Sequence, residues 1–357
     1  MSKSLHTPFV DFVLLGGGSL IALLAIRGMA GIMDLEAAWS VVTTLFLANL
    51  VNHPHFACSY QIFYGDFKNK LISSKYEASL RRRYFFFGVI APIAFALGLA
   101  WLVWEKNVHA LGLAANLMFL LVGWHYVKQG YGMAMLDAAL KRAFFSEDEK
   151  KALLRNAYAA WLLAWLLVNY LAKNQAPSYF GIPYVALSVP KWALLLSAAG
   201  AGVTLLHCVV LLSRARVQNR RLPWNGLLAY GVSLYAWLLV RDPIVVLWVP
   251  LFHSLQYMAV VWRFQTNRCK ADADRRVSYR YRLLGFFAVS FVLGYYMFWQ
   301  APAWLDTNVP YDTTVFGTSL FFFLFWIFIN VHHYLLDTVM WRKGNPEVKR
   351  HLFAPPA

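Results

Sequence analysis

Four clusters of ligand-type side chains lie inside long apolar stretches of this chain. Each holds histidine together with a nearby amide, phenol or carboxylate: Asn52-His53-Pro54-His55, His125-x-x-x-Gln129, His253-x-x-Gln256-Tyr257 and His332-His333-x-x-x-Asp337. An ionisable group inside a membrane is costly and marks a functional site by default. Imidazole and carboxylate groups are ligands of iron, zinc, copper and manganese. The four clusters therefore predict one polar site assembled from four helices.

Helical spacing decides which of these side chains can face one centre. Residues four apart share a helix face, so His125 can act with Gln129, and His333 with Asp337. His332 and His333 point about 100° apart, so one can ligate a metal while the other reaches a second metal or a neighbouring helix. The expected ligands of one or two metal ions are His53, His55, His125, His253, His332, His333 and Asp337. The side chains expected to orient them or to contact a substrate are Asn52, Lys128, Gln129, Gln256 and Tyr257.

Each of these residues also has a simpler interpretation. A single histidine in a membrane helix often only bridges two helices through hydrogen bonds, and four clusters at matched depth favour a shared site. His207 stands alone on its apolar segment and is interpreted as structural. Lys128, one turn from His125, is expected either to balance the charge of a substrate or of Asp337, or to extend its ammonium group towards the membrane surface.

The composition indicates an integral membrane protein. Hydrophobic residues make up 60% of the 357 residues and charged residues 14%, whereas globular domains have about 25% charged residues. We expect an all-α, polytopic helical bundle that forms a single domain over residues 1–357. The net charge of +16 lies mostly in short loops between apolar segments, where it orients the protein and contacts anionic lipid, so nucleic acid is not an expected partner.

Hydropathy predicts about ten membrane spans, at 8–31, 37–64, 84–104, 108–137, 153–173, 190–213, 225–240, 243–264, 284–303 and 315–341. Lys and Arg gather in the loops after the even-numbered spans, which places both termini in the cytoplasm. All four histidine clusters lie on even-numbered spans. His253 and His332 each lie ten residues before an arginine, Arg263 or Arg342. That spacing puts the site roughly 15 Å below the cytoplasmic surface, in the inner half of the bilayer.

Two local motifs predict details of the helices. Ser146 followed by Glu149 is typical of a capping box at a helix start. The run Gly16-Gly17-Gly18 predicts close packing of the first helix against a neighbour. The three cysteines show no C-x-x-C spacing and are interpreted as ordinary thiols.

The histidine pattern resembles that of the histidine-motif membrane oxygenases. These include fatty-acid desaturases and hydroxylases and the Brp/Blh carotene dioxygenases of microbes, and the single histidines scattered over many helices are closest in style to the latter. The resemblance rests on His53, His55, His125, His253, His332, His333 and Asp337. It implies iron held on the cytoplasmic side of the membrane and oxidation of a lipid-soluble substrate by dioxygen.

Three functions follow from these observations. The first is a membrane metalloenzyme, an oxygenase, hydroxylase or desaturase that depends on iron or, as alternatives, on zinc, copper or manganese. Its substrate is hydrophobic or lipid-like, and an external electron donor would dock at the basic cytoplasmic loops. The second is a transporter or proton-coupled carrier that uses the intramembrane His, Asp and Lys residues. The third is a haem-binding electron-transfer protein with histidine axial ligands.

Overall fold

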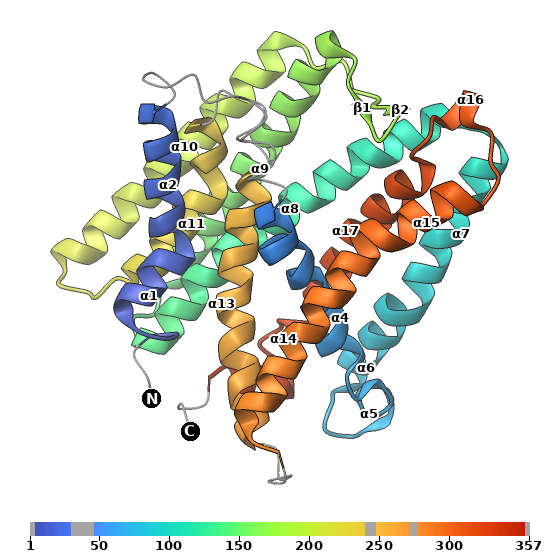
Figure 1. Ribbon diagram of the computed structural model, residues 1–357. Coiled ribbons are helices and arrows are strands. Elements are labelled where there is room, and N and C mark those ends of the chain that lie inside the picture. The colour runs from blue at the N-terminus through green and yellow to red at the C-terminus, as the bar shows by residue number, and fades with distance from the viewer. Residues whose placement is uncertain (1–3, 30–45, 240–247, 272–276, 354–357) are drawn as a thin grey trace.

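The protein is a bundle of helices with one short hairpin (Figure 1). The computed structural model describes residues 4–29, 46–239, 248–271 and 277–353. The N-terminal half contains α1 (Pro8–Phe12), η1 (Val13–Gly17), α2 (Gly18–Met29), η2 (Ala48–Asn52), α4 (His53–Tyr64), α5 (Phe67–Ile72), α6 (Ala78–Phe85), η3 (Phe86–Ile90), α7 (Ala91–Trp104), α8 (Val108–Lys141) and α9 (Glu147–Gln175). The C-terminal half contains the antiparallel strands β1 (Ser178–Tyr179) and β2 (Ile182–Pro183), then α10 (Lys191–Val217), α11 (Trp224–Tyr235), η4 (Ala236–Leu239), α13 (Trp248–Ala271), α14 (Tyr279–Tyr295), η5 (Tyr296–Gln300), α15 (Ala301–Asn308), α16 (Thr313–Phe316), α17 (Leu320–Met340) and α18 (Pro346–His351).

Six helical stretches within the described residues are long and apolar enough to cross a membrane. They are Pro8–Ala25, Ala78–Trp104, Val108–Lys141, Lys191–Val217, Tyr279–Asn308 and Leu320–Met340. They agree with the expected all-helical membrane bundle. The expected span at 153–173 lies within the helix α9. The expected spans at 37–64, 225–240 and 243–264 fall in part on residues outside the described ranges, so the count of ten stays a prediction.

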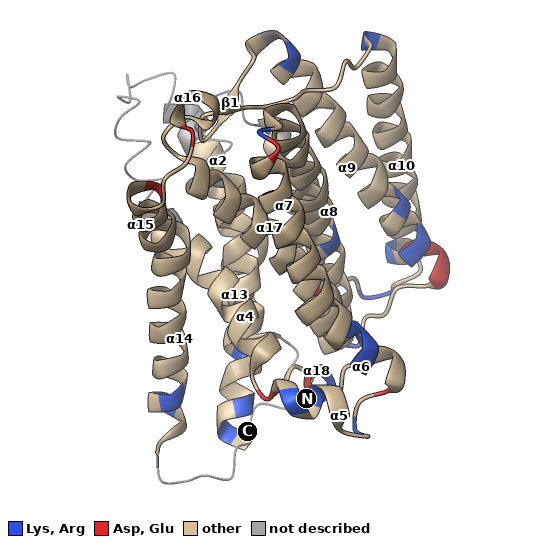
Figure 2. Ribbon diagram, turned by 90° about the vertical axis from the view of Figure 1, so that its right-hand side faces the viewer, with Lys and Arg blue, Asp and Glu red and all other residues tan. Residues whose placement is uncertain are grey.

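Basic residues gather at one end of the bundle, which we call the basic end. Figure 2 shows Lys and Arg segments near α5, α6, α18 and the adjoining ends of α13 and α14, and a further group at the lower ends of α9 and α10. At this end the buried ammonium group of Lys70 donates to the carbonyl oxygens of Ile62 and Phe63 and pairs with Glu347 at 3.3 Å. At the opposite end Lys106 pairs with Asp312. The basic end is the one that we expect on the cytoplasmic side, and this orientation stays a prediction.

Proline interrupts three helices in the same way. The wide π-turns η2, η3 and η5 each end two residues before a proline, at Pro54, Pro92 and Pro302. Proline lacks the amide donor, and its ring clashes with the carbonyl one turn earlier, so the preceding turn widens to accommodate it. In α4 this irregular turn comes directly before His53 and His55, and it therefore affects where both imidazoles point.

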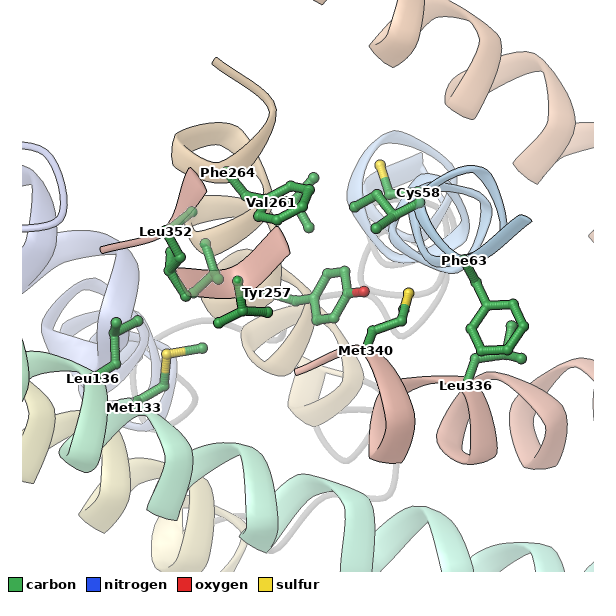
Figure 3. Packing of buried hydrophobic residues seen from close by; sticks show 14 of the residues in the cluster. Cys58, Phe63, Met133, Leu136, Tyr257, Val261, Phe264, Leu336, Met340 and Leu352 are labelled. Atoms are coloured by element: carbon green, nitrogen blue, oxygen red, sulfur yellow. The ribbon is translucent and has the colours of Figure 1, made fainter. Parts of the chain in front are cut away.

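The helices that carry the histidines share one apolar core. Side chains of α4, α8, α13 and α17 meet in a buried cluster, with Tyr257 lying among Leu336, Met340 and Cys58 (Figure 3). Gly16 permits a close approach of the first helix, because a β-carbon there would lie 3.3 Å from the α-carbon of Ala229 in α11. The close packing expected from the glycine run is therefore confirmed at Gly16.

Candidate metal centre

Five ligand-type side chains from four helices converge in the bundle interior. They are His55 on α4, His125 on α8, His253 on α13, and His333 and Asp337 on α17, and we call them the histidine centre. All five are buried, with exposures between 1% and 8%. The spacing of His333 and Asp337 puts both on one helix face, as the sequence predicted. The other three come from separate helices, so only the tertiary fold brings them together.

The ligand atoms of the histidine centre form two overlapping groups. His55, His253 and His333 make one group, and His125, His333 and Asp337 make the other; within each group the atoms lie within 4.8 Å of one another. Asp337 Oδ2 is 3.6 Å from His333 Nε2 and 3.7 Å from His125 Nε2. Ligand atoms about 2.0–2.2 Å from a metal ion lie roughly 3–4.4 Å apart. Small side-chain rotations therefore suffice to bring either group onto one ion.

The imidazoles of the centre leave nitrogen atoms buried without hydrogen bonds. Within the described residues, Nε2 of His55, His125 and His253 and both ring nitrogens of His333 have no hydrogen-bond partner. Buried polar atoms in folded proteins are nearly always satisfied, and an unsatisfied one costs about 1–3 kcal/mol. Several such nitrogens close together would therefore destabilise a cluster that had only a structural role. Coordination of a cation would satisfy one lone pair on each imidazole.

His55 has the tautomer that a metal ligand requires. Its Nδ1 contacts the backbone carbonyl of Asn52, and because a carbonyl can only accept, Nδ1 carries the proton. The Nε2 lone pair is then directed away from that contact and is available to a cation. Ser254 Oγ lies 3.0 Å from the same Nδ1 and donates to Asn52 Oδ1 at 2.7 Å. Such hydrogen bonds fix the orientation and tautomer of metal-bound histidines.

Asp337 is held by a chain of hydroxyl groups. Tyr257 donates to Asp337 Oδ1 at 3.1 Å, while Ser59 Oγ lies 2.5 Å from the Tyr257 oxygen. Trp341 donates its indole N–H to the same tyrosine oxygen. These contacts use Oδ1 and leave Oδ2 directed at the two histidines. Asp337 thus presents one carboxylate oxygen to His125 and His333.

Two glutamines from the predicted set tie the helices together around the centre. Gln129 donates to the backbone carbonyl of His253 and to Gln256 Oε1, at 2.8 and 3.3 Å. Gln256 donates in turn to the carbonyl of Leu15 and accepts from Ser233. These bonds join α8, α13, α11 and η1. Both glutamines therefore position helices, and neither belongs to the two groups of ligand atoms.

Two predicted ligands, His53 and His332, lie outside the histidine centre. His332 Nε2 is 3.1 Å from the Phe87 carbonyl and its Nδ1 is 2.9 Å from Tyr60 OH, so both nitrogens are satisfied by protein groups. His53 stacks on Phe298 with ring centroids 4.4 Å apart. The 100° offset along α17 sends His332 to a neighbouring helix, one of the two outcomes that the spacing allowed.

The remaining polar candidates also face away from the centre. Lys128 is exposed, and its ammonium group lies 5.6 Å from the centroid of the Trp124 ring. This cation–π contact holds the ammonium group at an exposed face, and the role of the lysine stays a prediction. His207 is exposed on α10. Its separate position agrees with the interpretation that it is no part of the site.

Sequence reasoning missed Ser59, Ser254 and Phe56 as neighbours of the centre. Ser59 lies four residues after His55 and Ser254 directly follows His253, so helical spacing was a usable signal for Ser59. The ring of Phe56 lies 4.1 Å from His55 and 4.7 Å from His333, centroid to centroid. A phenylalanine beside histidines gives no sign in sequence that distinguishes it from lipid-facing residues.

A glycine on α14 supports the histidine-bearing end of α4. A β-carbon at Gly294 would lie 2.7 Å from the carbonyl carbon of His53 and 2.9 Å from the nitrogen of Pro54. The absence of a side chain therefore lets α14 lie directly against the proline-interrupted turn.

A helical bundle can carry many different functions, so the fold alone does not indicate what this protein does. No protein-family model, curated protein or solved structure matches this chain.

Proposed function

We propose that this protein is a membrane-embedded metalloenzyme that oxidises a hydrophobic or lipid-like substrate with dioxygen. The observation that supports this proposal most strongly is the histidine centre, in which four imidazoles and one carboxylate are buried together and five ring nitrogens have no hydrogen-bond partner among the described residues. A merely structural cluster would pair these nitrogens within the protein. A catalytic metal site needs this donor set and an apolar surrounding that excludes water.

The donor types favour nonhaem iron. His125, His333 and Asp337 form a set of two histidines and one carboxylate, which is typical of iron(II) oxygenases that keep positions open for other ligands. His55 and His253 supply two further imidazoles for the same ion or for a second one. Zinc, copper and manganese accept the same ligands and are the alternatives that a metal analysis separates. When bound, a redox-active ion would supply the capacity to activate dioxygen.

Aromatic side chains surround the histidine centre. The walls around the centre include Phe56 and Tyr126, and the Tyr126 ring stacks on His253 with centroids 4.1 Å apart.

Hydroxylation converts R–H, O₂, two electrons and two protons into R–OH and water, and desaturation uses the same electrons and releases two waters. Both need an external electron donor, whereas a dioxygenase places both oxygen atoms in the product and needs none. The basic end is where an acidic donor protein would dock.

Metal content and oxygen uptake test the proposal. Protein purified in detergent is analysed by plasma mass spectrometry, before and after anaerobic reconstitution with ferrous iron. We expect about one or two iron ions per chain and oxygen uptake by the iron-loaded protein when a total lipid extract of the expression host and a chemical electron donor are added. Protein that cannot be loaded with any transition metal contradicts the proposal.

The same preparation separates the other two functions. An intense Soret band with bound haem would identify an electron-transfer protein. Metal-free protein that moves a solute or protons across liposomes, with a rate that changes near the usual imidazole pKa of about 6.5, would identify a carrier.

A further inference from the structure

A pocket of about 220 Å³ opens at the basic end, between the start of α6 and the end of α17. A single water needs about 10–15 Å³ of such space, so the pocket has room for a group much larger than a few waters. Its lining residues are Glu77, Ser79, Leu80, Arg83, Arg342 and Gly344. None of them belongs to the histidine centre, so the pocket is a separate feature of the molecule.

The pocket carries charges of both signs. Arg83, Arg342 and Glu77 are exposed, and within the described residues none of their charged groups takes part in a hydrogen bond or an ion pair. The formal charge of the lining is +1, from two arginines and one glutamate. A simple anion would be attracted by the arginines and repelled by the glutamate. A ligand that carries both a negative and a positive group therefore complements this lining better.

Helix geometry places the two signs in different parts of the pocket. Ser79 and Arg83 are four residues apart, so they share one face of α6. Glu77 is the N-cap residue of this helix, six residues before Arg83, which is roughly 9 Å along the axis. Arg342 comes from the opposite wall, two residues after the end of α17. Guanidinium groups bind phosphate oxygens through paired hydrogen bonds, so the arginines suit a phosphate group and Glu77 suits an ammonium group.

The level of the pocket along the bundle indicates a lipid headgroup. One apolar stretch of membrane length begins at Ala78 and another ends at Met340, so the pocket lies where both leave the apolar zone. In a bilayer that these stretches cross, this is the level of the phospholipid headgroups. The exposed rings of Phe85 and Phe86 follow on α6 and η3, where acyl chains would contact them. Basic pockets between membrane helices are typical sites for lipid headgroups.

We propose that this pocket binds an aminophospholipid, with the phosphate of the headgroup between Arg83 and Arg342 and its primary ammonium group against Glu77. The Ser79 hydroxyl donates to the same phosphate, and the acyl chains lie along the exposed phenylalanine rings. Phosphatidylethanolamine carries both charged groups. The trimethylated amine of phosphatidylcholine cannot donate a hydrogen bond to a carboxylate, and phosphatidylglycerol has no positive group at all. Binding requires no metal ion in the histidine centre.

Single-charge variants and three lipids test the assignment. Native mass spectrometry of the full-length protein gives the Kd for phosphatidylethanolamine, phosphatidylcholine and phosphatidylglycerol with identical acyl chains. Arg83→Gln and Arg342→Gln should each weaken the binding of all three lipids about two- to fivefold, the range for one exposed ion pair. Glu77→Gln should weaken only the binding of phosphatidylethanolamine, by a similar factor. Arg82→Gln is the matched control, because this exposed arginine lies on the same helix and does not line the pocket.

Two results would overturn the proposal. One is an Arg82→Gln variant that weakens lipid binding as much as Arg342→Gln does, and the other is a Glu77→Gln variant that affects phosphatidylethanolamine and phosphatidylglycerol alike. All four variants change exposed side chains, so their unfolding midpoints should match that of the wild type.

A soluble headgroup distinguishes a lipid site from a site for a soluble phosphate ester. Glycerophosphoethanolamine carries the same charges without acyl chains. We expect it to displace phosphatidylethanolamine only at concentrations at least about a hundredfold higher than the Kd of the lipid, because buried acyl methylene groups add affinity. A soluble headgroup that binds as tightly as the lipid would overturn the assignment to a lipid.

Discussion

Two buried polar clusters in this bundle differ in whether their polar atoms are hydrogen-bonded within the protein. The asparagine network of Asn116, Asn169 and Trp165 joins α8 and α9 to the segment after β2, and both asparagines are at most 4% exposed. Asn116 donates to Asn169 and to the Val185 carbonyl, and accepts from the Trp165 indole. Asn169 in turn accepts from the Leu187 amide. The histidine centre is also buried, and five of its ring nitrogens have no such partner in the part of the chain that the structure describes.

This difference distinguishes a polar cluster that only stabilises the fold from one that can bind a ligand. Each donor and acceptor of the asparagine network has a fixed partner, so the network holds helices in register and needs no ligand. The five unpaired ring nitrogens of the histidine centre lack this compensation, which the proposed metal ion would supply in part. The two clusters should therefore respond oppositely to mutation. Removing a side chain should damage the fold in the network and damage ligand retention in the centre.

Loss of a central ligand should have the largest effect. We expect His333→Ala to reduce metal retention about a hundredfold or more, because His333 belongs to both ligand groups and even outer partners of a metal contribute about 10–100-fold. Plasma mass spectrometry on folded, monodisperse protein measures it. The controls are His332→Phe, at the residue before His333, and His207→Ala on α10. A variant at His332 that loses as much metal would show that the centre has a different ligand set.

Removing one hydroxyl from the support of Asp337 should have an intermediate effect. Tyr257→Phe deletes the donor to Asp337 Oδ1 and should weaken metal affinity about 10–100-fold while leaving the ring packed in place. A competition titration with a coloured chelator measures the affinity. Tyr60→Phe removes a comparable hydroxyl from His332 and should leave the affinity unchanged. Equal affinities in the Tyr257 variant and the wild type would show that Asp337 is not a ligand.

The asparagine network should respond in stability and not in metal content. Asn169→Ala removes the acceptor of one Asn116 N–H and of the Leu187 amide, which should lower the free energy of unfolding by about 1–3 kcal/mol. Denaturant unfolding in mixed micelles measures this, with exposed Asn308→Ala on α15 as the control. Metal stoichiometry should match that of the wild type. A network variant that loses metal would mean that the two regions are coupled.

A surface ion pair should give the smallest effect. A hydrogen bond from Lys106 is the main cause that lowers the pKa of Asp312 from 3.8 to about 2. The stability from this pair is present above pH 3.8 and is lost as the pH falls towards 2. Both groups face solvent, so the loss is small and salt-sensitive. Lys106→Gln should flatten the fall of the unfolding midpoint between about pH 4 and pH 2, and parallel curves for the two proteins would contradict this.

Local sequence rules predicted the parts of this molecule that depend on neighbours along the chain. The capping box is present, with Ser146 accepting from the Glu149 amide and Glu149 accepting from the Ser146 amide. The pairing of His333 with Asp337 follows from the period of the helix. Apolar length predicted the six membrane-length helices within the described residues. Orientation in the membrane and the number of spans stay predictions.

Spacing alone could not sort the histidines into ligands and neighbours. His53 and His55 are separated by one proline and were expected together, yet one faces the centre and the other faces Trp299 and Phe298. Their directions depend on the π-turn before Pro54 and on Gly294 of a helix some 240 residues later. The contact with Gly294 joins segments that are distant in sequence, which periodicity does not encode.

By itself the sequence determined that this chain forms apolar helices and that four of them carry residue types that can bind a metal ion. Apolar length and helical period are properties of short segments, so they can be read without a fold. Only the tertiary structure decided that His55, His125, His253, His333 and Asp337 meet, and that His53 and His332 turn elsewhere. The physical reason is that a ligand set needs lone pairs directed at one point in space, and helix packing alone sets those directions.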